Sequence, residues 1–154
     1  MNISEHISLK EAIRSNTAKR LGIDNNPDED ALANMKVIAT TVFEPLRNYF
    51  NEPIYISSFY RSPELNKAIG GSTRSQHCKG EAIDIDDVYS KANNADFFNY
   101  IKDKLDFDQL IWEFGNDNNP DWVHVSYSLG QNRRRILKAV KQNGRTQYID
   151  ITNE

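Results

Sequence analysis

The chain has 154 residues, a net charge of −3 and a single cysteine, Cys78. This length suits one domain with one hydrophobic core. The acidic balance argues against a general nucleic-acid-binding protein, which is usually basic. One cysteine excludes an internal disulfide and a thiolate-only metal site, so any metal must be held largely by histidine and carboxylate side chains.

No apolar stretch approaches the roughly 18 residues that a membrane helix needs. Residues 1–10 also lack the apolar centre and the small-residue cleavage site of a secretory signal. We therefore expect a protein that is made in the cytoplasm and does not insert into a membrane. If it acts outside the cell, another factor has to release it.

The first part of the chain, residues 1–27, is predicted to be an N-terminal docking segment. Ser8 and Glu11 have the spacing of a capping box, which predicts a short helix after Ser8. Gly22 predicts the end of a second short helix over residues 17–21. Residues 28–154 would form the core of the same single domain.

The clearest helix is predicted over residues 28–50, where apolar residues recur at helical spacing. Pro45 lacks a backbone donor, so we expect a kink or a local break there. Shorter helices are predicted over 63–69 and 92–105.

Strands are predicted from alternating or β-branched stretches bounded by turn residues, at 53–59, 82–86, 109–114, 122–127, 134–140 and 146–149. The Asn143-Gly144 pair between the last two is a strong hairpin signal. Helices that precede and interleave with mostly antiparallel strands define an α+β class. We expect a small, mostly antiparallel sheet with flanking helices.

Three side chains are candidates for one metal site: His77, Asp84 and His124. The Lys79-Gly80 turn would let the chain fold back from His77 to Asp84, because glycine adopts positive φ readily. Zinc in hydrolases usually takes three nitrogen or oxygen ligands and leaves one position for water. A His and an Asp at this separation are also often unrelated surface or core groups, so spacing alone leaves both interpretations open.

Three motifs resemble the zinc D-alanyl-D-alanine carboxypeptidase superfamily. Residues 75–84, Ser-Gln-His-Cys-Lys-Gly-Glu-Ala-Ile-Asp, are similar to its Ser-x-His-x-x-Gly-x-Ala-x-Asp motif. Residues 58–63, Ser-Phe-Tyr-Arg-Ser-Pro, resemble the end of its Ser-Gly-Tyr-Arg strand, and residues 122–126, Trp-Val-His-Val-Ser, resemble its final histidine strand. The order and the separations are similar to those of phage-borne M15 muralytic peptidases, over about residues 9–127.

The resemblance implies a hedgehog/DD-peptidase-like zinc fold, in which His77, Asp84 and His124 bind one Zn²⁺ ion. It also implies that Arg61 holds the oxygen of the scissile carbonyl. This role suits a guanidinium group, which stays charged and offers several donors to an oxyanion. The alternative for Arg61 is a surface ion pair with Glu64.

The general base has two candidates. In many relatives a glutamate stands three residues before the final histidine, and Asp121 has that position here. Glu113, on the partner strand of the predicted hairpin, is the competing candidate. We favour Asp121 because of its position in the motif. Strict alternation of side chains along the strand would point Asp121 away from His124, unless the chain bends at Pro120.

Ser75, Gln76 and Trp122 lie beside the expected ligands and are predicted to contact substrate, although hairpin tryptophans are more often core or cross-strand residues. The arginines at 133–135 form a basic cluster, which we interpret as a solvated strand face rather than as a site for an anionic wall polymer.

The resemblance implies a zinc metallopeptidase, either a D,D-carboxypeptidase or an endopeptidase, that degrades the cell wall by cleaving stem-peptide bonds of bacterial peptidoglycan. The missing secretory signal suits a phage or prophage endolysin that a holin releases, or a virion component. The alternative is a catalytically inactive zinc-binding module with a structural or wall-binding role. We expect the stem peptide as partner, no nucleic acid, and a monomer.

Overall fold

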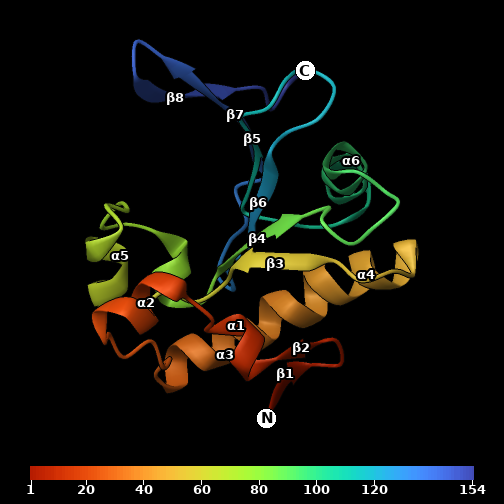
Figure 1. The fold of residues 1–154 in the computed structure, drawn as a ribbon. Coiled ribbons are helices and arrows are strands. Elements are labelled where there is room, and N and C mark those ends of the chain that lie inside the picture. The colour runs from red at the N-terminus through yellow and green to blue at the C-terminus, as the bar shows by residue number, and fades with distance from the viewer.

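A six-stranded sheet runs through the molecule, with its strands in the order β3-β4-β6-β5-β7-β8 (Figure 1). The computed structural model describes residues 1–154. The strands are β3 (Tyr55–Ser58), β4 (Ala82–Asp86), β5 (Gln109–Glu113), β6 (Trp122–Ser126), β7 (Arg135–Gln142) and β8 (Arg145–Asp150). Neighbouring strands are antiparallel except β5 and β7, which are parallel.

Helices flank this sheet, which confirms the α+β prediction. They are α1 (Leu9–Ala12), α2 (Asn16–Leu21), α3 (Glu29–Ile38), α4 (Glu44–Phe50), α5 (Pro63–Ala68) and α6 (Asn94–Lys104). A small second sheet pairs β1 (Asn2–Ser4) with β2 (Ile7–Ser8). Figure 1 shows α3 and α4 running along β3, with α5 and α6 on opposite sides of the sheet. None of the helices combines the length and the apolarity needed to span a bilayer.

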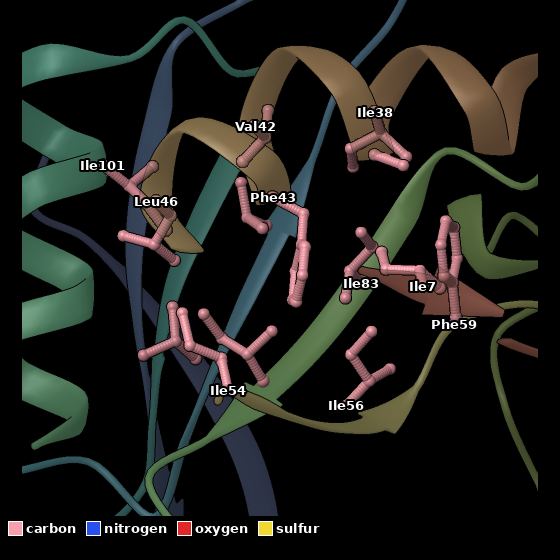
Figure 2. Packing of buried hydrophobic residues seen from close by; sticks show 14 of the residues in the cluster. Ile7, Ile38, Val42, Phe43, Leu46, Ile54, Ile56, Phe59, Ile83 and Ile101 are labelled. Atoms are coloured by element: carbon pink, nitrogen blue, oxygen red, sulfur yellow. The ribbon is translucent and has the colours of Figure 1, made fainter. Parts of the chain in front are cut away.

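The core lies between one face of the sheet and the helices α3, α4 and α6. Figure 2 shows side chains from these elements meeting in one cluster, among them Ile38, Val42, Phe43, Leu46, Ile54, Ile56, Ile83 and Ile101. Successive strand residues point to opposite faces. Because Ile83, Leu110, Val123 and Val125 belong to this core, the residues that alternate with them face away from it.

The long helix predicted over 28–50 is broken, as expected, close to Pro45. A π-helical turn, Ala39–Phe43, joins α3 to α4, and Pro45 lies in the first turn of α4. A proline inside a continuous helix would remove a backbone donor and clash with the preceding turn. The π turn changes the backbone register at this point, and its buried side chains remain in the core.

Three features extend the predicted arrangement. The docking segment contains the two predicted short helices but also the β1–β2 pair. The segment between α5 and β4 contains a 3₁₀ turn, η2 (Gln76–Lys79). The predicted β7–β8 hairpin turns at Asn143 and Gly144, which have φ values of 53° and 75°, but its pairing with β5 was not anticipated.

Candidate metal centre

The three predicted metal ligands meet on the face of the sheet that points away from the core. Asp84 on β4 lies directly opposite His124 on β6, so both side chains leave the sheet on the same side. His77 comes from η2, whose start is fixed by the hydroxyl oxygen of Ser75 accepting the backbone N–H of His77. Gly80 ends this turn with φ 74°, as the turn prediction requires.

The distances among the three side chains suit a single ion. The Nδ1 atom of His124 lies 2.8 Å from Oδ1 of Asp84, and Nε2 of His77 lies 3.3 Å from the same oxygen. One ligand atom from each residue lies within 4.8 Å of the others. The structure therefore brings together the three side chains that the sequence motifs single out.

The contacts of His77 indicate that the site is built for a cation. Its Nδ1 atom lies 2.7 Å from the carbonyl oxygen of Phe59. Because a carbonyl oxygen only accepts, Nδ1 carries the hydrogen and Nε2 presents its lone pair to the site. Nε2 is buried and has no hydrogen-bond partner. A buried acceptor nitrogen without a donor is rare, and a bound metal ion accounts for it.

The protonation states of His77 and Asp84 match this interpretation. Burial lowers the pKa of His77 below its ordinary value, and the attraction of Asp84 offsets only part of that effect. Burial acts to raise the pKa of Asp84, but His77 and His124 outweigh it and hold that pKa well below the usual range. Burial also acts to lower the pKa of His124, but the hydrogen bond to Asp84 raises it above its ordinary value. A neutral imidazole and an ionised carboxylate are the forms that bind metal, so His77 and Asp84 are held in the binding form, whereas His124 has to give up a proton to bind.

The three side chains line an open groove with a volume of about 1140 Å³. Arg61, Glu113, Asp121, Ser75, Gln76 and Trp122, all predicted from the sequence, line the same groove. The predicted ligands and the predicted catalytic and substrate-binding candidates are therefore gathered at one place.

Arg61 follows β3 and is tied to the metal-binding segment through its backbone, since its N–H donates to the carbonyl oxygen of His77 at 3.2 Å. Its Nε atom is buried and has no hydrogen-bond partner. The side chain makes no ion pair with Glu64 or with any other carboxylate. The guanidinium group is thus free to bind an oxygen of a molecule in the groove.

The two candidate bases occupy different environments. Glu113 lies opposite Trp122 in the β5–β6 register, on the same face as His124, and is only 7% exposed. Burial, with a further contribution from the charge of Asp84, raises its pKa to about 7, although His124 acts in the opposite direction. Asp121 precedes β6, is exposed, and donates its backbone N–H to the carbonyl oxygen of Glu113 at 2.9 Å. The cross-strand candidate is therefore the one held beside the ligands.

The predicted substrate contacts have structural partners as well. Gln76 donates from Nε2 to the buried Asp108 at 3.1 Å, and the ring of Trp122 packs against Phe114 with a centroid distance of 5.5 Å.

The arginines at 133–135 are exposed, as predicted, and they also make polar contacts. Arg133 donates to both carboxylate oxygens of Asp108, at 3.0 and 2.8 Å. Arg134 donates to the backbone carbonyl oxygens of Leu105 and Lys102.

Sequence reasoning missed the contribution of the C-terminal hairpin to the groove. Leu137 and Lys141 from β7 and Thr146 and Tyr148 from β8 all line it. The Asn-Gly turn predicted the hairpin, but only the parallel pairing of β5 with β7 brings its inner face beside Glu113.

Comparison with known proteins gives one finding. Residues 5–126 match the family model described as Peptidase M15. The matched span contains the three candidate ligands, Arg61 and both candidate bases, and it ends with β6. A search among curated proteins finds no match.

Proposed function

Because the chain belongs to the peptidase M15 family and is therefore a metallopeptidase-type hydrolase, we propose that it is a zinc-dependent enzyme that cleaves stem-peptide bonds of bacterial peptidoglycan. The observation that carries the zinc dependence is the buried, unpartnered Nε2 atom of His77, which faces Asp84 beside His124. The resemblance to muralytic peptidases supports the choice of substrate.

His77, Asp84 and His124 would hold the zinc ion. When bound, zinc supplies Lewis-acid chemistry that makes water nucleophilic near neutral pH. Arg61 binds the carbonyl oxygen of the scissile bond and stabilises the negative charge that develops on it. The free Nε atom of Arg61 supports this role.

Glu113 would move the proton. It takes a proton from the attacking water as the C–O bond forms and negative charge develops on the carbonyl oxygen. It then delivers that proton to the nitrogen of the leaving amine as the C–N bond breaks. A general base works best when its pKa lies near the working pH. In the metal-free protein, burial raises the pKa of Glu113 to about 7, so its surroundings favour proton uptake by this carboxylate.

We propose Glu113 rather than Asp121 as the base, in place of the preference drawn from motif position. The β5–β6 register puts Glu113 on the face that carries His124. Asp121 lies outside the strand and is exposed to solvent. An exposed carboxylate keeps its water shell and is a weaker candidate for proton transfer inside the groove.

We further propose that the enzyme acts in lysis as an endolysin-like or virion-associated protein of a phage or prophage, on the basis of its resemblance to phage-borne muralytic peptidases. It would work as a monomer on the peptide of the wall, without a nucleic-acid partner.

The test is digestion of purified peptidoglycan by the zinc-loaded protein, with the released fragments identified by mass spectrometry. A carboxypeptidase releases free D-alanine, whereas an endopeptidase opens cross-links and leaves larger peptides. Glu113→Gln, with its zinc content checked, is the matched control. If the wild-type protein sediments with peptidoglycan but produces no new peptide ends, the alternative of an inactive wall-binding module is correct.

A further inference from the structure

The β7–β8 hairpin forms a wall of the groove that lies outside the span matched by the family. The match ends at residue 126, whereas Lys141, Thr146 and Tyr148 from the hairpin line the groove together with Glu113. Figure 1 shows the hairpin projecting from the end of the sheet on the side where α5 lies. A molecule bound in the groove therefore meets residues that the family match does not cover.

The strand register aligns Tyr148 with the candidate base. Glu113 on β5 lies opposite Ala139 on β7, and Ala139 lies opposite Tyr148 on β8. Residues directly opposite one another in a sheet place their side chains on the same face. The residue between Glu113 and Tyr148 carries only a methyl group, so no bulky side chain separates them along this row.

Tyr148 is available to a ligand. It is 57% exposed and lines the groove, so its ring and its hydroxyl group can contact a bound molecule. Partial burial, and then the negative charges of Glu113 and Asp84, raise the pKa of its hydroxyl group. The hydroxyl group is therefore close enough to Glu113 and Asp84 to interact with their charges, and it remains a protonated donor across the neutral pH range. Tyrosine offers an apolar ring and a polar tip at low entropic cost, which suits peptide binding.

We propose that Tyr148 binds the substrate peptide beside Glu113, with its hydroxyl group donating a hydrogen bond to a backbone carbonyl oxygen of the peptide and its ring packing against the chain. The β7–β8 hairpin is then the wall that determines which peptides fit the groove. This inference rests on the proposed peptidase function, because it assigns a residue to the binding of that substrate.

Gln147 provides a matched control. It precedes Tyr148 on β8, lies opposite Val140, and points to the other face of the hairpin. Gln147→Ala disturbs the same exposed strand without touching the groove. Tyr148→Phe removes the hydroxyl alone, and Tyr148→Ala removes the ring as well.

The experiment measures kcat and KM of the wild type and of each variant for a soluble stem-peptide fragment. It also measures the Kd of the same fragment for each substitution placed in the Glu113→Gln background. Tyr148→Phe should raise KM and Kd roughly 2- to 10-fold, the cost of one neutral hydrogen bond, with kcat nearly unchanged. Tyr148→Ala should raise both further. Gln147→Ala should leave both unchanged, and all variants should keep their zinc and their melting temperature.

Unchanged KM and Kd in both Tyr148 variants, or a loss confined to kcat, would overturn the inference while the wild-type enzyme still cleaves the fragment. Failure of the wild-type protein to cleave any peptidoglycan fragment is a different result. It would remove the proposed function, and the role of Tyr148 with it.

Discussion

The Nδ1 atom of His77 lies 2.7 Å from the carbonyl oxygen of Phe59, and this contact decides which ring nitrogen faces Asp84. Phe59 directly follows β3, so the edge of the sheet orients a ligand that comes from the η2 turn. A hydrogen bond of this kind fixes the tautomer of a metal-binding histidine and orients its ring. The protein itself therefore organises the candidate metal site.

The first prediction concerns zinc content. His77→Ala and His124→Ala should each lose the single bound zinc, because two remaining ligands hold the ion poorly. His6→Ala is the matched control, since the imidazole of His6 binds Glu44 at 2.6 Å in a separate cluster. Metal analysis after dialysis measures the result. Full zinc content in either of the first two variants, or its loss in His6→Ala, would contradict the assignment.

The second prediction concerns Arg61. Arg61→Ala should keep the fold and the zinc but lower kcat about 10²- to 10³-fold, the typical cost of one oxyanion donor. Arg74→Ala is the control, because Arg74 lines the same groove but is exposed, and its loss should have a much smaller effect. Steady-state kinetics on a stem-peptide fragment provides the comparison. Similar rates for the two variants would remove Arg61 from the mechanism.

The third prediction concerns Gly80, which ends the η2 turn. A Cβ atom at this position would clash with the carbonyl oxygen of Ala31, in addition to the strain of a φ of +74°. Gly22 has a similar φ of +67° but open space around it. Gly22→Ala should cost about 1–2 kcal/mol of unfolding free energy, and Gly80→Ala about 1–3 kcal/mol more because of the clash.

Urea denaturation of both glycine variants measures these costs. Gly80→Ala should also weaken zinc binding, because the clash displaces the turn that carries His77. Equal losses of stability in the two variants would show that the contact with Ala31 is not close.

Local patterns in the sequence were sufficient to predict several elements. Strand β4 has the predicted bounds, Ala82–Asp86, because its buried isoleucines alternate with aspartates. The break before Pro45 was predictable because a missing backbone donor is a property of one residue. The candidate ligand set could be proposed from the sequence because its motif combines residue type, order and glycine placement.

Pairing between distant strands could not be predicted in the same way. No local pattern specifies that β5 pairs in parallel with β7, since strand preference depends on neighbours supplied by the fold. This pairing places Tyr148 in the groove. The choice between Glu113 and Asp121 could not be predicted for the same reason. Position in a motif favours Asp121, whereas the cross-strand register, which is known only from the fold, places Glu113 beside His124.

The fourth prediction concerns the pH dependence of stability in the metal-free protein. Burial raises the pKa of Glu113 from 4.5 to about 7, so the folded state favours the protonated form. The resulting stabilisation is fully present below pH 4.5 and is lost as the pH rises through about 7. It amounts to at most about 3 kcal/mol.

Glu113→Gln carries a neutral side chain at every pH and lacks this dependence. The unfolding free energy of the variant minus that of the wild type should therefore increase between about pH 4.5 and pH 7. Urea denaturation in the presence of a chelator measures both curves. Parallel curves, or a difference that decreases as the pH rises, would show that Glu113 is not buried in its neutral form.

The most direct test of the central claim is the rate at which the zinc-loaded protein releases new amino groups from purified peptidoglycan, compared with Glu113→Gln and Asp121→Asn at equal zinc content. The wild type and Asp121→Asn should cleave at similar rates, and Glu113→Gln about 10²- to 10⁴-fold more slowly, the usual contribution of a general base. No release by the wild type would contradict the peptidase assignment. Loss of activity in Asp121→Asn with full activity in Glu113→Gln would contradict the assignment of the base.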